Sequence, residues 1–332
     1  MFDRDEWLAT RTETVLQPER EIVDPHHHLW AWPTFTPYLQ DELWRDTSSG
    51  HNIKQTIYIE CGWAYDKEAE EHFQSVGETR FVAELAEAAK ASPEKSQIAA
   101  IIAHTDLRSP KLNEALDAHI EAGNGLLRGF RHSGACDDDP ALTIAGPAPK
   151  GLYLMSAYQE GTRRLGERGL TFDSWIHHHQ IDDLKTLARS APGTTFIIDH
   201  FGTPLGVGKY AGKRDEIYAQ WKLDIAELAK CPNVYAKLGG LAMPDNGWGY
   251  EALETPPSSD QLVADQGNWY HYTIDVFGPD RCMFESNFPV DRASISYHVL
   301  WNAFKKMADR YTAHEQDAMF AGTARKVYRL TS

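Results

Sequence analysis

Short apolar runs alternate with longer amphipathic segments along almost the whole chain, and this alternation predicts the fold. Eight runs are rich in apolar or β-branched side chains, as buried parallel strands are. They span residues 21–24, 56–61, 97–103, 126–131, 170–176, 195–199, 234–238 and 282–286. Segments with apolar residues at i, i+3 and i+4 lie between them and predict helices, among them 80–91, 111–121, 180–190 and 215–230.

Strands that alternate with helices predict βαβ units, and eight such units predict a closed α/β fold of the (β/α)8 TIM-barrel type. We expect one domain over residues 1–332, with residues 1–20 as an N-terminal arm. An open doubly wound sheet is the alternative, but it needs a glycine-rich turn after the first strand, where this chain has three histidines. Residues 242–259 lack periodicity and predict a lid or binding loop, with a surface excursion as the alternative.

The composition argues against several classes of function. Lys and Arg number 33 against 48 Asp and Glu, a net charge of −15, so neither nucleic acid nor an anionic membrane is expected as a partner. No apolar run approaches the length of a membrane span, and the first residues are charged throughout, so no signal peptide is expected. Four cysteines without a CxxC pair favour a reducing cytoplasm. Homo-oligomer formation is left open.

Polar and ionisable side chains stand near the carboxyl end of nearly every predicted strand. In barrels of this type the chemistry is carried by these ends and by the loops that follow them. The candidates, in strand order, are His26, His28, Glu60, His104, Arg128, Arg131, His178, His200, Asn287 and Asp291. A structural barrel does not need such a ring of polar groups, so the pattern predicts an enzyme with a small-molecule substrate.

The pair His26-x-His28 after the first strand is the sharpest single motif. In an extended segment, residues i and i+2 point to the same side, so both imidazoles can face one point. Imidazole binds Zn²⁺, Mn²⁺ and similar ions, and a third ligand must come from another strand. We therefore expect one divalent ion, Zn²⁺ or Mn²⁺ first, on His26, His28 and His200. Local hydrogen bonding and metal-independent chemistry are the alternatives.

Six segments resemble the amidohydrolase-2 branch of the amidohydrolase superfamily, which includes lactone hydrolases. They are IVDPHHHLW, LLRGFRH, FDSWIHHHQIDDL, IIDHFGTPLG, VYAKLGGL and GPDRCMFESNFPVD, in order from residue 22 to residue 291. The resemblance covers nearly the whole chain and implies a distorted (β/α)8 barrel that acts on a cyclic ester. It also implies strand-end roles for His26, His28, His178 and His200, and substrate-carboxylate contacts for Arg128 and Arg131. Ion pairs with barrel acids are the alternative for the two arginines.

Two departures from the family pattern matter for the chemistry. No lysine lies between Lys111 and Lys150, so the bridging lysine of two-metal members is absent. The family's eighth-strand Asp, a metal ligand and general base, is replaced by Asn287, which cannot accept a proton. Glu285 and Asp291 are the nearest carboxylates, and desolvation is expected to raise the pKa of Glu285. The base stays open between these two, with His178 or His200 as a third option.

The sequence thus predicts a hydrolase that opens a lactone or related cyclic ester, with or without a carboxylate on the substrate. Substrate contacts are expected from Arg128, Arg131, Glu60, His104 and Trp248, although Trp248 could instead anchor its loop on the barrel. One alternative is a metal-dependent decarboxylase of an aromatic or enol acid. Another is a catalytically inactive barrel that binds a small molecule. A serine hydrolase is not supported, because no GxSxG elbow occurs.

Overall fold

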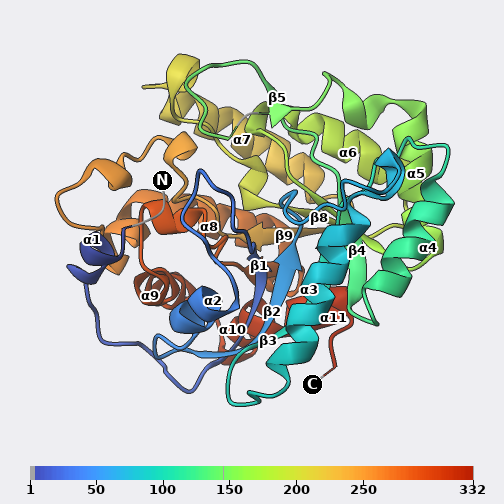
Figure 1. Cartoon of the computed structure of the whole chain (residues 1–332). Coiled ribbons are helices and arrows are strands. Elements are labelled where there is room, and N and C mark those ends of the chain that lie inside the picture. Colours follow the sequence, from blue (N-terminus) through green and yellow to red (C-terminus); the bar gives the residue numbers. More distant parts are fainter. Residues whose placement is uncertain (1–3, 145, 332) are drawn as a thin grey trace.

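The computed structural model describes residues 4–144 and 146–331, and its centre is a parallel eight-stranded barrel (Figure 1). The strands, in spatial order, are β1 (Glu21–His27), β2 (Asn52–Ile59), β3 (Gln97–Ala103), β4 (Leu127–Arg131), β7 (Thr171–Ser174), β8 (Phe196–Ile198), β9 (Val234–Leu238) and β10 (Cys282–Phe284). Each predicted strand is present, so the (β/α)8 prediction is confirmed. Because chain order and spatial order agree, the carboxyl ends of all eight strands meet at one rim.

Amphipathic helices surround the strands (Figure 1). They are α3 (Val76–Ala89), α4 (Leu112–Ala122), α5 (Ser156–Glu167), α6 (Ile181–Ser190), α7 (Arg214–Leu228), α8 (Ser259–Phe277) and α9 (Tyr297–Ala308). In α6 the spacing of Ile181, Leu184 and Leu187 places all three on the buried side. The four helices named from the sequence are therefore confirmed, with ends that shift by up to four residues.

The barrel is distorted where its first and last strands meet. No hydrogen-bond ladder joins β1 and β10 in the described part of the chain; the segment after β10 closes the rim instead. There the backbone N–H of His28 donates to Phe288 O at 2.8 Å, and that of Asn287 donates to His26 O at 3.0 Å. This closure brings the His26–His28 motif next to Asn287, although 259 residues separate His28 from Asn287 in the sequence.

Helix α11 (Thr323–Tyr328) closes the opposite end of the barrel. Its Val327 and Tyr328 pack against inward-facing side chains of the strands, which include Val23, Ile57, Ile59, Ala100, Ile102, Ile197 and Met283. The Tyr328 hydroxyl donates to Asp173 Oδ2 at 2.6 Å, deep inside the barrel. An apolar layer therefore lies beneath the polar groups of the site.

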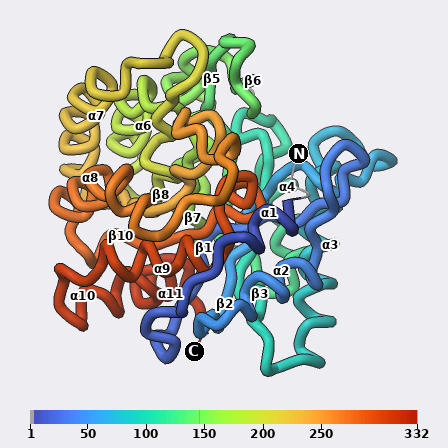
Figure 2. Tube along the Cα trace, turned by 90° about the vertical axis from the view of Figure 1, so that its left-hand side faces the viewer, coloured from blue at the N-terminus to red at the C-terminus, as the bar shows by residue number. Residues whose placement is uncertain are grey.

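The described part of the expected arm, residues 4–20, lies outside the barrel, and residues 1–3 fall outside the described range. After α1 (Asp5–Ala9) the segment runs beside α9 (Figure 2). There Lys305 Nζ donates to Leu16 O at 2.8 Å and to Gln17 O at 2.9 Å. Among the described residues, no helix has the length and apolar character that crossing a membrane requires.

A short hairpin between β4 and α5 is a feature that the sequence pattern did not predict. It consists of β5 (Cys136–Asp137) and β6 (Gly146–Pro147), which pair antiparallel (Figure 2). Two-residue strands are too short for any hydrophobic period to be visible. The hairpin lies at the rim formed by the carboxyl ends of the strands, where it contributes to the site.

Candidate active site

A cavity of about 620 Å³ opens at the carboxyl ends of the strands. Its apolar wall includes four aromatic side chains and several aliphatic ones, among them Trp30, Trp32, Phe35, Trp175, Ile144, Pro147, Met243 and Val290. Its polar groups include His28, Glu60, His104, Arg131, His132, His200 and Asn287. A concave, largely apolar cavity with a few convergent polar groups is typical of a small-molecule site.

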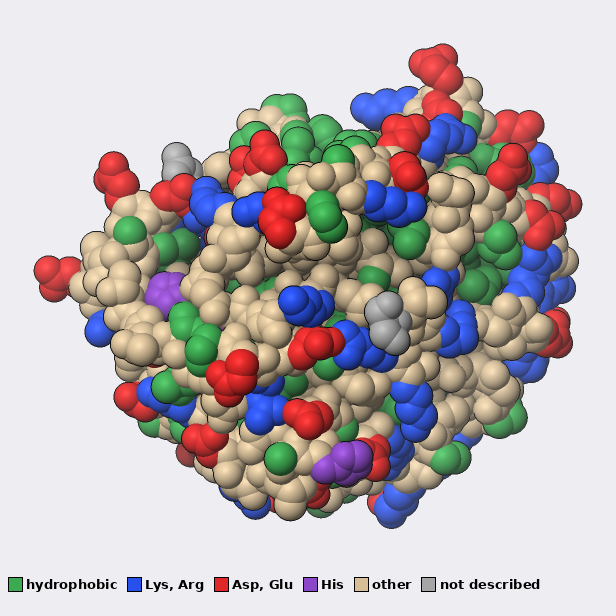
Figure 3. Space-filling model, turned by 90° about the horizontal axis from the view of Figure 1, so that it is seen from below, with side chains coloured by type: hydrophobic (Ala, Val, Ile, Leu, Met, Phe, Trp, Pro, Cys, Tyr) green, Lys and Arg blue, Asp and Glu red, His purple; other side chains and the backbone are tan. Residues whose placement is uncertain are grey.

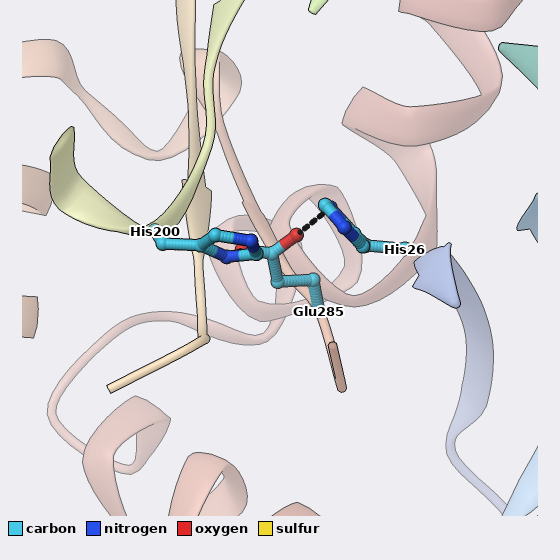
Figure 4. Close-up of side chains that lie close together, drawn as sticks. All are labelled: His26, His200 and Glu285. Carbon is cyan, nitrogen blue, oxygen red and sulfur yellow. Dashed lines mark hydrogen bonds and ion pairs between the residues drawn. The ribbon is translucent and has the colours of Figure 1, made fainter. Parts of the chain in front are cut away.

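Glu285 lies beneath the cavity floor, between two imidazole rings (Figure 4). Its Oε1 is 2.7 Å from His200 Nδ1, and its Oε2 is 2.8 Å from His26 Nδ1. Burial alone would raise the pKa of this carboxyl, but the two imidazoles outweigh burial and lower it to about 2. The expectation of a raised pKa for Glu285 is therefore wrong, because the sequence does not reveal that both oxygens are paired.

Hydrogen bonds fix the tautomer of two histidines. An ionised carboxylate only accepts, so His200 donates its Nδ1–H to Glu285. His28 donates its Nδ1–H to Ile59 O at 2.8 Å. Both rings are left with an Nε2 lone pair, and a carboxylate or carbonyl behind a histidine is the arrangement that orients such rings for proton transfer or metal binding. His26 Nδ1 faces both Glu285 Oε2 and the Lys237 ammonium, so these contacts do not select one tautomer of His26.

His26 and His28 have the spacing of two ligands of one divalent ion, and the group whose ligand atoms lie within 4.8 Å of one another is His26, His200 and Glu285. Two nitrogens bound to a tetrahedral ion at about 2.1 Å lie about 3.4 Å apart. The Nε2 atoms of His26 and His28 are 3.3 Å apart, and the ring of His200 lies 4.5 Å from that of His26. Glu285 also lies within ligand range of His26 and His200, but its contacts have hydrogen-bond length. It is placed behind the histidines rather than beside them.

A buried charge network supports His26 from below. Lys237 Nζ lies 2.6 Å from Asp173 Oδ2, 3.1 Å from Asp199 Oδ1 and 3.2 Å from His26 Nδ1. Burial lowers the pKa of Lys237, but the carboxylates of Asp173 and Asp199 outweigh burial and raise it, so the lysine stays charged. With Tyr328 on Asp173, the network runs from the C-terminal helix to the site. The presence of a lysine within the otherwise apolar strand 234–238 was the only sign of this buried charge network in the sequence.

Arg131 is neutralised at the cavity wall. Its Nε donates to Glu60 Oε1 at 2.7 Å, and its Nη2 donates to the Glu60 carbonyl at 2.6 Å. A third contact, at 3.4 Å, joins Nη1 to Asp199 Oδ2. Both Arg131 and Glu60 line the cavity, as expected, but they face it as an ion pair.

Asn287 lines the cavity, and Asp291 holds its side-chain amide. Its Nδ2 donates to Asp291 Oδ1 at 2.9 Å, while the Ala242 N–H donates to Asp291 Oδ2 at 3.1 Å. Burial raises the pKa of Asp291 to about 7. Asn287 lines the cavity and Asp291 does not, so Asp291 acts on the site through the amide.

Comparison with known proteins agrees with this geometry. The Amidohydrolase family model matches residues 23–330. The chain belongs to the amidohydrolase family. It is 28% identical over 257 residues to an L-fucono-1,5-lactonase of Burkholderia multivorans, covering 76% of this chain and 77% of the relative. An L-fucono-1,5-lactonase of Burkholderia ambifaria is 25% identical, with 93% and 95% of the two chains covered.

The same fold occurs in a solved amidohydrolase. A crystal structure from Burkholderia multivorans with bound zinc superimposes with a TM-score of 0.73 at 23% identity, covering 93% of this chain and 99% of that one. The present chain is thus an enzyme of the amidohydrolase type, a hydrolase similar to lactonases.

Three expected site residues of this amidohydrolase lie away from the cavity. His178 Nδ1 accepts from the Leu205 N–H at 3.3 Å, and its ring packs against Tyr210. Arg128, near the amino end of β4, donates to the Gly125 and Leu127 carbonyls. Trp248 lies under the guanidinium of Arg214, 3.5 Å from its carbon, so it anchors its loop as the alternative held. The three residues were expected in the site because they lie in strands, at strand ends or in the 242–259 loop. These positions alone do not predict where a side chain points.

Other residues of the amidohydrolase site were missed. Trp30 and Trp32 follow His28 at steps of two and line the cavity with it, a parity that the sequence already contains. Trp175 also lines the cavity, as does His132, which follows the fourth strand directly. From the expected lid loop, residues 242–259, only Met243, Pro244 and Asp245 reach the cavity; they belong to its wall.

Proposed function

We propose that this amidohydrolase opens a neutral lactone, with His200 as the base that activates water. The observation that carries the proposal is Glu285, bound to His200 Nδ1 at 2.7 Å beneath the cavity floor. A carboxylate behind an imidazole holds the Nε2 lone pair toward the cavity and stabilises the imidazolium that proton transfer forms. The lactonase relatives support a cyclic ester as the substrate class.

The chemistry follows from these positions. His200 Nε2 takes a proton from water as the water oxygen bonds to the lactone carbonyl carbon. The ring C–O bond then breaks, and His200 returns the proton to the departing ring oxygen, which gives a hydroxy acid. Asn287 lines the cavity and has a second N–H besides the one bound to Asp291, so it is available to stabilise the carbonyl oxygen as charge develops.

A divalent ion, Zn²⁺ or Mn²⁺, would be held by the Nε2 atoms of His26, His28 and His200. When bound, it supplies Lewis-acid polarisation of the ester. The lone pair of His200 serves either the ion or the proton, not both at once. Dialysis against a chelator separates these roles: we expect the metal-free enzyme to keep turning over, whereas loss of activity that Zn²⁺ restores would make His200 a ligand.

The cavity favours an uncharged substrate. Arg131 already faces Glu60 and Asp199, so a substrate carboxylate would have to compete with two protein carboxylates. The aromatic wall, including Trp30 and Trp32, suits the C–H faces of a saturated ring. These two features support a neutral sugar lactone and disfavour the decarboxylase alternative, whose substrate must bring a carboxylate.

The test compares three compounds on the same enzyme: a neutral 1,5-lactone of a sugar acid, its carboxylated analogue, and a hydroxybenzoate. We expect acid release from the neutral lactone and no CO₂ from the hydroxybenzoate. His200→Asn should lower kcat by about 10²–10⁴-fold, and Asn tolerates the positive φ of 53° at this position. The exposed His314→Asn is the control. CO₂ release without lactone opening would overturn the proposal.

A further inference from the structure

A second cluster of metal-ligating side chains lies outside the cavity. His177 and His179 follow β7, and Asp137 lies in the hairpin strand β5. One ligand atom of each residue lies within 4.8 Å of the others. None of the three lines the cavity, so the proposed hydrolysis does not use them.

The side chains are already placed for a shared ligand. His177 is 1% exposed, and its Nδ1 has no hydrogen-bond partner among the described residues, an arrangement that costs free energy unless something binds it. His179 Nε2 donates to Cys136 O at 3.3 Å and lies 3.9 Å from Asp137 Oδ2, so metal binding would exchange the hydrogen bond to the carbonyl for a bond to the ion. The buried imidazole, the second imidazole and the carboxylate are close enough to share one ion.

Neighbouring contacts hold this arrangement in place. Gln180 Oε1 accepts from the Cys136 N–H at 3.0 Å and from the His177 N–H at 3.2 Å, which ties the hairpin to the histidine segment. Tyr210 stacks on the ring of His179 with an interplanar angle of 14° and donates its hydroxyl to Asp137 Oδ2. Partners of this kind orient the ligands of known metal sites.

We propose that Asp137, His177 and His179 form a second site, for a divalent first-row transition ion such as Zn²⁺ or Co²⁺. Two neutral imidazoles and one carboxylate are a ligand set that these ions prefer, with further positions left to water. This site is separate from the His26–His28–His200 donors and goes beyond the proposed function.

The ion would connect the β5–β6 hairpin, which forms part of the cavity wall, to the segment after β7. Asp137 is in β5, whereas Ile144 and Pro147, further along the same hairpin, line the cavity. Gly146 packs directly on His177: a Cβ there would lie 2.8 Å from His177 Cε1. Binding at the cluster would therefore link the hairpin to the segment after β7 and restrict the motion of the cavity wall.

The ammonium group of Lys209 competes with a metal ion for the Asp137 carboxylate. Its Nζ donates to Asp137 Oδ1 at 2.7 Å, so an ammonium group neutralises the carboxylate. A second cation next to this ammonium is repelled, which lowers affinity. Removal of the ammonium should thus strengthen metal binding, an effect that a purely structural histidine cluster would not show.

The first experiment titrates metal-free protein with Co²⁺ and follows its d–d absorption and the bound stoichiometry. His179→Ala should weaken binding of one equivalent by at least about tenfold, and Lys209→Met should tighten the same equivalent by about tenfold. His314→Ala, an exposed histidine on α10 (Ala313–Asp317), is the matched control. Unchanged stoichiometry and affinity in both cluster variants would overturn the proposal, whether or not the cavity histidines bind Co²⁺.

The second experiment measures hydrogen exchange in peptides that cover residues 136–149, with and without Zn²⁺. Slower exchange on metal addition is expected in the wild type and in His200→Asn, but not in His179→Ala. Protection that disappears in His200→Asn instead would assign the effect to the cavity ion and contradict a hairpin site. Because the readout is not activity, failure of the lactonase proposal leaves this test intact.

Discussion

Glu285 stays ionised in a fully buried position because the imidazole rings of His200 and His26 lie against its two oxygens. A carboxylate held in this way has no proton affinity to offer at neutral pH. Its contribution is to fix the tautomer of His200 and to stabilise positive charge on that ring. In the proposed hydrolysis Glu285 is therefore a positioning residue, and His200 is the group that takes the proton from water.

The first prediction tests this role with Glu285→Gln, which keeps the volume but removes the charge. We expect kcat to fall by about 10²–10³-fold, with KM changed little, because the amide cannot stabilise an imidazolium and does not fix both rings. Steady-state kinetics on a neutral lactone give both constants. Glu160→Gln on the exposed side of α5 is the control. A raised KM at unchanged kcat would show that Glu285 serves substrate binding instead.

Glu78 gives a prediction about stability. Its Oε1 accepts from the Tyr58 hydroxyl and from the Cys61 and Trp63 N–H groups, while its Oε2 has no partner within the described residues. Burial raises the pKa of Glu78 to about 7, so the folded protein favours the neutral acid. A raised folded pKa gives stability that is complete below the unfolded pKa of about 4.5 and is lost as pH rises through 7.

The second prediction follows from that sign. Glu78→Gln retains a neutral side chain with the Oε1 acceptor. Between pH 4.5 and 7 the free energy of unfolding of the variant should therefore fall less than that of the wild type, by the amount that Glu78 contributes. That amount is of the order of 3 kcal/mol. Urea unfolding at half-unit pH steps measures the difference between wild type and variant. A difference that does not change with pH would mean that Glu78 is ionised in the folded protein.

At the scale of elements, hydrophobic pattern predicted what depends on local periodicity. The strands 97–103 and 234–238 have the same bounds in sequence and structure, because each is an apolar run that ends at polar or glycine residues. The hairpin of β5 and β6 was not predicted, because its two-residue strands are too short to show a hydrophobic period. The packing of α11 under the barrel was not predicted either, because no local sequence pattern indicates which segment a helix contacts. The same limit applies to the site: parity predicted the His26–His28 pair, whereas Lys237, Tyr328 and the pairing of Arg131 depend on contacts between distant segments.

Helix α11 gives the third prediction, Tyr328→Phe. Loss of the hydroxyl removes the 2.6 Å hydrogen bond to Asp173, which is bonded to Lys237 under the site. We expect the free energy of unfolding to fall by about 1–3 kcal/mol. We also expect kcat to fall by a larger factor than the factor by which KM rises. Denaturant unfolding and kinetics measure the two effects, with the half-buried Tyr235→Phe as control. Equal behaviour of the two variants would show that the tail helix and the site are not coupled.

At the scale of the whole molecule, the charge of −15 bears on which substrates reach the cavity. On the face drawn in Figure 3, acidic and basic side chains are interspersed. A net negative charge repels anions over about a Debye length, and salt screens the repulsion. The pairing of Arg131 with Glu60 means that the cavity offers little attraction in compensation.

The last prediction combines both effects in a salt series. For a neutral lactone, kcat/KM should stay constant between 10 and 200 mM NaCl, whereas for the carboxylated analogue it should start lower and rise by about twofold to fivefold, because salt screens the repulsion. Glu60→Gln removes one of the two carboxylates that pair with Arg131 and should raise kcat/KM for the carboxylated analogue alone. Glu160→Gln, which also removes one negative charge but does not line the cavity, is its control. If the wild-type rate on the carboxylated analogue fell with salt, Arg131 would already attract carboxylates, and the preference for a neutral substrate would be wrong.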